Sequence, residues 1–389
     1  MNGSVKKNKY IIVASLLMVA LMALAIYFIT YDVALFYGLL FGLFIGFFLQ
    51  RSRFCFASGF RDIFLIRNGS MTRALLFMLF INSIGFFLLH VTGNINLFQA
   101  GALQPVGLNT IIGGLLFGFG LILAGSCVSG CLMRMGEGYI GQWVVFVGIM
   151  VGSYLPSLDL DSLSPFSPHA GNLIFIPDYL GWLWTIIIYV VVFVFLHCLI
   201  SIYEGVTVKK IIPPHPGRSF KKILVGKAIN YYYGAFFLAL LHIIIIFSWG
   251  RTVSLINGIS GFSAWLVDQF NRLTPYWSDH PGWSSQDVVS GAWLNPILYF
   301  AVALIIGAAV ASLINSEFRL RFPKKPITYL YSLGGGLLLG FSSNMAVGCN
   351  FGAFWSGISS FSLQGWVFGL FILIGSFLGG KIYIRFLIH

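Results

Sequence analysis

Residues 113–131 are GGLLFGFGLILAGSCVSGC, and residues 335–353 are GGLLLGFSSNMAVGCNFGA. The two segments align without a gap, at a constant offset of 222 residues (335 minus 113). The matched pairs include Gly118 with Gly340, Cys127 with Cys349, and Gly130 with Gly352. Similar apolar stretches often arise by chance, but a matched cysteine inside matched glycines is much less common. The pattern therefore indicates an internal repeat.

The composition around this repeat is that of an integral membrane protein. Of the 389 residues, 58% are hydrophobic and only 9% are charged, and the mean hydropathy is +0.90. A soluble domain carries roughly 25% charged residues. A soluble fold with this composition would lack a polar surface, so we expect most of the chain to lie in a lipid bilayer.

Apolar runs long enough to cross a bilayer, about 20 residues each, recur along the whole chain. The first resembles a signal peptide, but its length and the apolar segment that follows favour an uncleaved spanning helix. The expected crossings are 11–30, 33–50, 73–90, 110–136, 141–156, 180–203, 229–249, 293–314, 328–358 and 365–386. The sequence thus predicts an all-α polytopic membrane protein.

The basic residues set the expected orientation. With the amino terminus in the cytoplasm, every Lys and Arg except Arg251 and Arg272 falls inside, as the positive-inside rule requires. The formal charge of +12 therefore reflects topology, and no continuous basic face indicates nucleic-acid binding. A Pro- and Lys-rich cytoplasmic linker, 204–228, separates two membrane halves, 1–203 and 229–389. Both termini are expected in the cytoplasm.

The two copies of the repeat are expected to have opposite orientations, because three crossings lie between them. Inverted repeats whose interrupted helices meet near the midplane are a recurring transporter architecture. The fold prediction is therefore an inverted-repeat transporter with re-entrant or broken helices. The first interruption contains Gly125, Ser126, Cys127, Ser129, Gly130 and Cys131, and the second contains Gly348, Cys349, Asn350 and Gly352.

The residue types in these interruptions suggest an anion with a soft atom. Glycines let the backbone turn and expose N–H groups, which a lined pore tolerates and lipid does not. Helix amino termini after Gly130 and Gly352 would favour an anion, and thiols suit a sulfur or selenium atom. The alternative is that the glycines only allow close helix packing and that cysteine serves as another small residue.

A third cysteine follows two arginines at the inner end of the second crossing, in the segment Leu49–Phe56. Arg51 and Arg53 beside Cys55 would favour a thiolate and attract anions to the inner mouth. An equally weighted alternative is that the arginines serve topology and that Cys55 is an incidental buried residue.

Taken together, these motifs resemble the YeeE/YedE family of bacterial inner-membrane proteins, which take up thiosulfate or related sulfur species. The matching segments are QRSRFCFASGFRD at 50–62, GSCVSGCLMRMGEG at 125–138 and VGCNFG at 347–352. The resemblance implies a path in which Cys55, Cys127 and Cys349 contact the sulfur of thiosulfate in turn. It also implies a location in the bacterial inner membrane and a small cytoplasmic sulfur-carrier protein as a partner. A branch associated with selenium metabolism is similar too.

Two other functions compete with sulfur-anion transport. Cys127 and Cys131 are four residues apart, so a membrane thiol oxidoreductase or sulfurtransferase could use them as a relay. Neither a CxxC pair nor a flavin or haem motif supports this enzyme, and Ala353 stands where the second copy would complete the pair. Cysteines with nearby methionines could instead carry a soft metal such as Cu(I), but the arginines favour an anion. We expect no resident metal or cofactor.

Overall fold

The computed structural model describes residues 26–95, 103–155, 171–205, 229–271 and 295–387, together with Leu97 and a few positions before Ile26. In this part of the chain, β1 (Pro105–Val106) and β2 (Asn172–Leu173) form an antiparallel pair, and helices dominate the rest. The helices are α2 (Val33–Ser52), α3 (Phe56–Leu65), α4 (Ser70–Val91), α5 (Leu108–Ala124), α6 (Val128–Gly136), α7 (Ile140–Tyr154), α8 (Ile176–Gly205), α10 (Tyr231–Trp249), α11 (Leu255–Asn271), α13 (Pro296–Ile314), α14 (Ile327–Met345), η5 (Asn350–Ser356), α15 (Gly357–Ser359) and α16 (Leu363–Leu387).

The helices have the length and apolarity of membrane spans. Seven of the described segments could cross a bilayer, or eight if a bent pair counts as one span. The bent pair joins α14 to Asn350–Ser359 at an angle of 47°. α2 with α3, and α5 with α6, each form one of the seven spans. These findings confirm the predicted all-α polytopic membrane fold and one of its broken helices.

One expected crossing is shorter in the structure than the sequence suggested. α7 has 15 residues, and at 1.5 Å per residue it is roughly 22 Å long, less than the ~30 Å hydrocarbon core. The predicted first crossing, 11–30, lies mostly outside the described residues. Most of the linker 204–228 and Arg272 also lie outside them.

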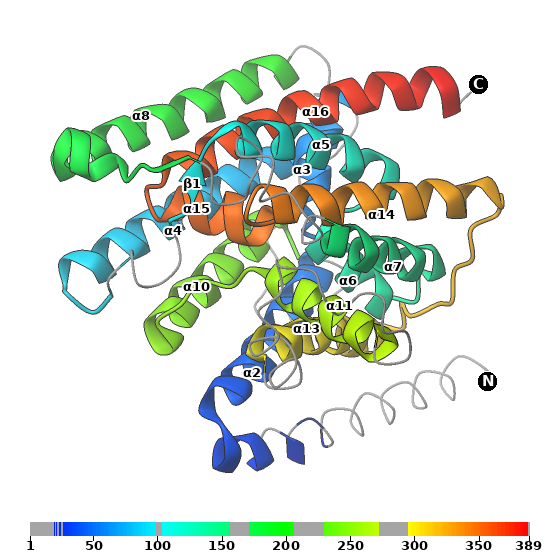
Figure 1. The fold of residues 1–389 in the computed structure, drawn as a ribbon. Helices are drawn as coiled ribbons and strands as arrows, with labels where there is room; N and C mark the ends of the chain where they lie inside the picture. Colours follow the sequence, from blue (N-terminus) through cyan, green and yellow to red (C-terminus); the bar gives the residue numbers. More distant parts are fainter. Residues whose placement is uncertain are drawn as a thin grey trace.

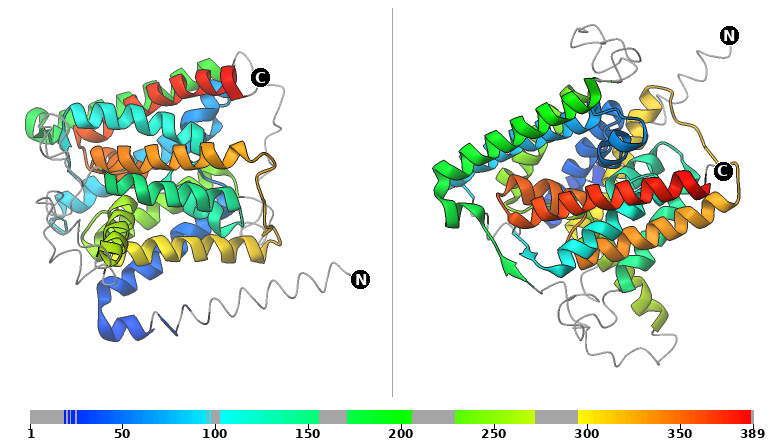
Figure 2. Two further views of the ribbon diagram at one scale, coloured as in Figure 1. Left: turned by 45° about the vertical axis from the view of Figure 1, so that its right-hand side comes forward. Right: turned by 90° about the horizontal axis from the view of Figure 1, so that it is seen from above.

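The long helices run in similar directions and form layers (Figures 1 and 2). α8 and α16 lie at one edge of the molecule, and α2 and α13 lie at the other. α14 packs chiefly on α7, α16 packs on α5, and α13 packs on α2. α5 of the first copy thus packs on α16, which follows the second copy, and α14 of the second copy packs on α7, which follows the first. The two halves therefore form a single packed body.

Matched glycines make these crossed contacts. A β-carbon on Gly118 of α5 would lie 2.7 Å from the Ser376 nitrogen of α16, and one on Gly340 of α14 would lie 2.6 Å from the Ser153 nitrogen of α7. Only glycine allows the backbones to come this close. For these two positions, the packing alternative stated for the repeat is therefore confirmed.

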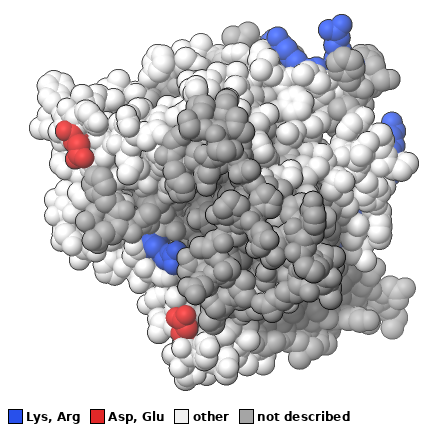
Figure 3. All heavy atoms as spheres, in the orientation of Figure 1, with Lys and Arg blue, Asp and Glu red and all other residues white. Residues whose placement is uncertain are grey.

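The surface has the charge distribution of a lipid-facing protein. On the face shown in Figure 3, charged side chains are few and most lie toward the edges. The loop before α14, with Lys324 and Lys325, lies at the same end of the molecule as the carboxyl end of α16, with Lys381 and Arg385 (Figures 1 and 2). We call this end the basic end. Its assignment to the cytoplasm stays a prediction.

Candidate functional site

The first interruption separates α5 from α6. α5 ends at Ala124, and Gly125 follows with φ of 69°, a left-handed conformation that suits glycine. Cys127 is extended and precedes the first residue of α6, and its carbonyl accepts a hydrogen bond of 2.7 Å from the Cys131 nitrogen. Arg134 Nη1 donates to the Gly125 carbonyl at 2.9 Å, which gives a hydrogen-bond partner to the carbonyl just after the last residue of α5.

The second interruption repeats this geometry between α14 and η5. Val347 and Gly348 have positive φ angles of 55° and 154°. Cys349 has φ −99° and ψ −170°, close to the −89° and −179° of Cys127. Its carbonyl accepts a hydrogen bond of 2.8 Å from the Ala353 nitrogen. The two matched cysteines therefore occupy equivalent positions, each just before a helix begins.

A glutamine supports each interruption in the same way. Gln142 Nε2 donates to the Ala124 carbonyl at 3.2 Å, and Gln364 Nε2 donates to the Ala346 carbonyl at 3.0 Å. The two glutamines are 222 residues apart, and so are the two alanines whose carbonyls they contact. This is the offset of the repeat. These amides satisfy carbonyls that the helix ends leave without an intrahelical partner.

The two glutamines differ in their second contact, which leads to a prediction. Ser126 donates to Gln142 Oε1, whereas Gly348 at the matching position has no hydroxyl, and Gln364 Oε1 has no partner among the described residues. Gln142→Ala removes two hydrogen bonds and Gln364→Ala removes one. At about 1 to 3 kcal/mol for each buried group left unsatisfied, Gln142→Ala should lower the melting temperature more. Thermal denaturation in detergent would measure this, and equal or reversed losses would contradict it.

Cys55 lies at a third interruption, between α2 and α3, and reaches the first interruption. Arg53 is left-handed with φ of 50°, and Cys55 is extended just before α3. The Cys55 and Cys127 thiols are within hydrogen-bonding reach of each other. A β-carbon on Gly130 would lie 3.1 Å from the Cys55 Sγ and 3.5 Å from the Cys127 Sγ. The structure thus brings two thiols from distant sequence positions to one glycine.

The other cysteines have different surroundings. Cys349 Sγ lies against backbone N–H groups of its own interruption and of Ile256 in α11. Cys131 is buried and its thiol donates to the Gln142 carbonyl at 3.1 Å. Cys198 is exposed on α8, a helix that is mostly exposed on its outer side. Cys349 is therefore not part of the Cys55 and Cys127 contact.

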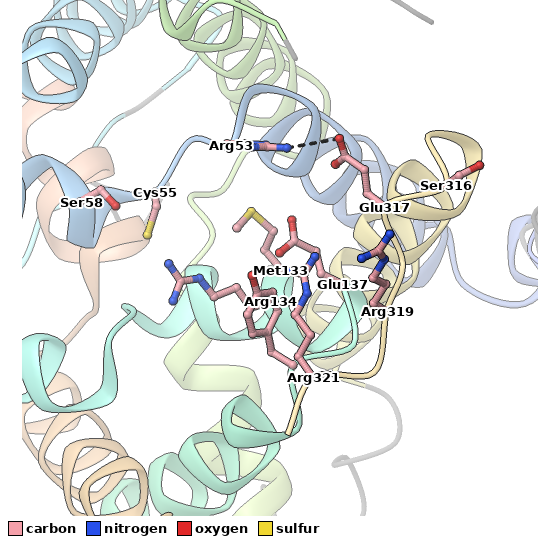
Figure 4. Close-up of a pocket in the computed structure, with 11 residues that line it drawn as sticks. Arg53, Cys55, Ser58, Met133, Arg134, Glu137, Ser316, Glu317, Arg319 and Arg321 are labelled. Carbon is pink, nitrogen blue, oxygen red and sulfur yellow. Dashed lines mark hydrogen bonds and ion pairs between the residues drawn. The ribbon is translucent and has the colours of Figure 1, made fainter. Parts of the chain in front are cut away.

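A pocket of about 490 Å³ opens beside Cys55 (Figure 4). Its lining is mainly polar and includes four arginines and two glutamates. The lining residues are Arg53, Cys55, Ser58, Met133, Arg134, Glu137, Tyr139, Ser316, Glu317, Arg319 and Arg321. The Arg134 side chain points toward Cys55 in Figure 4, and Arg53 forms an ion pair with Glu317 at 3.2 Å. Arg51 does not line the pocket, and its side chain is buried.

The charge of this pocket depends on the protonation of Glu137. Burial raises the pKa of the Glu137 carboxyl, and the guanidinium groups of Arg134 and Arg321 partly oppose the rise. A glutamate with a raised pKa loses its negative charge at a higher pH than an exposed one. The pocket therefore becomes more positive as the pH falls and the Glu137 carboxylate takes up a proton.

Three aromatic rings pack together next to the cysteines, since Phe56 follows Cys55 and Phe351 lies two residues after Cys349. Phe56, Phe351 and Trp355 are fully buried, and their ring centroids lie 4.5 to 6.5 Å apart. Cys127 and Cys349 are 0% and 1% exposed. Both cysteines are therefore enclosed by the protein in this structure.

A helical protein with several membrane spans, whose broken helices hold thiols at the base of a basic pocket, has the architecture of a transporter for a small solute. The chain belongs to the sulphur transport family, whose model matches residues 51–378. This membership confirms the family resemblance found in the sequence and agrees with a transporter rather than an enzyme.

Relatives with similar sequences are also named as transporters. The chain is 29% identical to the thiosulfate transporter TsuA of Spirochaeta thermophila over 343 residues, which cover 84% of this chain and 92% of that protein. It is 29% identical to the TsuA of Escherichia coli over 350 residues, covering 87% and 91%. A shorter match of 117 residues, 35% identical, covers 30% of this chain and 28% of the probable transporter YedE of Salmonella typhimurium.

The sequence argument missed several residues that shape this site. Gln142 and Gln364 were detectable, because they share the repeat offset just beyond the aligned segments. Arg134 and Glu137 fall within a quoted motif but were assigned no role beyond topology. The glutamate and arginines at 317–321 gave no local signal, since only the tertiary fold brings that loop to Cys55.

Proposed function

We propose that this protein takes up thiosulfate, or a related small sulfur-containing anion, through a central path lined by Cys55, Cys127 and Cys349. The observation that carries the proposal is the meeting of the Cys55 and Cys127 thiols over Gly130, at the base of a basic pocket. The names of the TsuA relatives support thiosulfate as the substrate.

The chemistry of thiosulfate fits the two kinds of group at the interruptions. Its terminal sulfur is soft and polarisable and suits the thiols. Its oxygens accept hydrogen bonds from backbone N–H groups, which the amino terminus of α6 supplies beside Cys127. Ser129 and Asn350 follow the two cysteines and add polar side chains to the path. A sulfate ion would lack the soft end of the substrate.

We further propose that the two halves, 1–203 and 229–389, form an inverted repeat about this path, with the residues 204–228 as a cytoplasmic linker. The equivalent cysteine conformations and the crossed glycine contacts of α5 with α16 and α14 with α7 support this arrangement. In such a fold one half can close the path on one side while the other opens it. The pocket opens at Cys55, whereas the aromatic rings next to it are buried and packed together. This arrangement fits a state in which the path is open at one end.

The location and the partner are part of the same proposal. The protein would lie in the bacterial inner membrane with both termini and the basic end in the cytoplasm, so that the pocket forms the exit. A small cytoplasmic sulfur-carrier protein would then receive the anion there. Cysteine-scanning with an impermeant thiol reagent, applied from either side of the membrane, would test the orientation.

Uptake of labelled thiosulfate by a host that lacks other uptake systems tests the central claim. Thiosulfate should compete strongly, and sulfate and metal salts weakly. Stronger competition by selenite than by thiosulfate would instead favour the selenium-species alternative. A change in the mass of Cys127 during turnover would favour a thiol oxidoreductase or sulfurtransferase, whereas unmodified thiols would support transport.

The raised pKa of Glu137 leads to a prediction about binding and pH. As the pH falls and Glu137 takes up a proton, the pocket gains positive charge, so the affinity for thiosulfate should rise. Glu137→Gln should bind more tightly at neutral pH and lose this part of the pH dependence. Calorimetry on the protein in lipid nanodiscs would measure both. Parallel pH profiles in the wild type and the variant would contradict the assignment to Glu137.

A further inference from the structure

Polar side chains without partners gather around the second interruption. Among the described residues, Asn350 is 1% exposed and neither atom of its side-chain amide has a hydrogen-bond partner. The buried Ser254 Oγ and the Trp355 Nε1 also have none. At the first interruption, by contrast, Ser126 and Ser129 both have partners. Buried polar atoms in a membrane protein normally have hydrogen-bond partners. The unpartnered atoms at the second interruption can therefore form hydrogen bonds with a bound ligand.

Ser254 occupies the place in the second half that Cys55 occupies in the first. Cys55 follows α2 and a left-handed Arg53, and α3 begins at the next residue. Ser254 follows α10 and a left-handed Gly250, with φ of 69°, and α11 begins at the next residue. Each of the two lies at the break between a long helix and the helix after it.

The contacts of the two residues correspond as well. The Cys55 Sγ lies 3.1 Å from a β-carbon built on Gly130, and the Ser254 Oγ lies 2.8 Å from one built on Gly352. Gly130 and Gly352 are matched positions of the repeat. The Cys349 thiol touches the backbone N–H of Ile256, at the start of the helix that Ser254 precedes. Ser254 therefore faces the second interruption as Cys55 faces the first.

We propose that Ser254 is a fourth substrate-contacting position, whose hydroxyl donates a hydrogen bond to an oxygen of the anion bound beside Cys349. The inference rests on the proposed function and adds to it a further residue and the atoms of the anion that this residue contacts. A hydroxyl is a stronger donor to oxygen than a thiol, and Asn350 adds an amide donor two residues from Gly352. At the second interruption, Ser254 and Asn350 thus supply hydrogen-bond donors for the oxygens of the anion.

Thermal denaturation of the full-length protein in detergent, with and without thiosulfate, tests this assignment. A ligand that binds only the folded state stabilises it by RT ln(1 + [L]/Kd), so the rise in melting temperature at a fixed ligand concentration reports the affinity. Ser254→Ala should melt like the wild type without ligand, but its affinity for thiosulfate should fall by about tenfold to a hundredfold, the loss expected for a hydrogen bond to a charged group. Ser263→Ala is the matched control, because Ser263 is a buried serine on α11, the helix that Ser254 precedes, and its hydroxyl donates to the Ile259 carbonyl.

Each outcome decides between the claims. If thiosulfate stabilises the wild type and Ser254→Ala equally, Ser254 does not contact the substrate. If thiosulfate neither stabilises the wild type nor is taken up by it, the proposed function itself fails. If Ser254→Ala does not fold, Ser254→Cys keeps the shape of the side chain with a weaker donor, and an affinity equal to that of the wild type would overturn the inference.

Discussion

Replacing Cys127 with alanine is expected to lower thiosulfate uptake by about tenfold to a hundredfold, the effect of losing a hydrogen bond to a charged substrate. Cys127 is fully buried, lies just before α6, and contacts both Cys55 and Ser129. The substitution removes the sulfur through which the first interruption, between α5 and α6, contacts Cys55 between α2 and α3. Because alanine also fits an extended position before a helix, the fold should persist.

Cys198→Ala provides the matched control for this experiment. Cys198 is exposed on α8, away from the pocket and from the interruptions, so its replacement should leave uptake unchanged. Initial rates of labelled thiosulfate uptake, normalised to the amount of protein in the membrane, would compare the two variants. Full uptake by Cys127→Ala at normal abundance would remove the thiol from the mechanism. Equal losses in both variants would mean that the loss is not specific to the Cys127 thiol.

The membrane fold was predictable because it depends on long-range averages of the sequence. Hydropathy located most of the helices, since burial in lipid requires runs of apolar residues. The interruption at 348–352 was also predictable, because glycine next to cysteine and asparagine breaks the apolar pattern. The exact form of the following segment, the π-helix η5, was not, since no local signal distinguishes its wider turns from those of an α-helix.

The candidate site was only partly predictable, for a geometric reason. Cys127 and Cys349 could be singled out by the repeat, and Cys55 by its arginines and by the family resemblance. That Cys55 meets Cys127 while Cys349 lies against Ile256 follows from how the helices pack, which no spacing rule gives. The same limit hid Ser254, whose likeness to Cys55 is in its place between helices and not in the residue itself.

The glycines of the repeat allow a second large effect to be predicted. Gly340→Ala should destabilise the protein by about 1 to 3 kcal/mol, the usual result of forcing a methyl group into a packed interior. The new β-carbon would lie 2.6 Å from the Ser153 nitrogen and would also overlap the Ile149 carbonyl oxygen. Both are backbone atoms of α7, which cannot rotate away as a side chain would. The melting temperature in detergent should fall by several degrees.

Gly334→Ala, on the same helix, separates this packing effect from the intrinsic preference of alanine for helices. A β-carbon on Gly334 would meet no atom within 4 Å. This variant should therefore keep the stability of the wild type or gain up to about 1 kcal/mol from helix propensity. If both variants were equally stable, α14 and α7 would not be in backbone contact at Gly340. Because the matched Gly118 makes the same contact between α5 and α16, Gly118→Ala should reproduce the loss, as expected if both crossed helix pairs hold the interruptions in place.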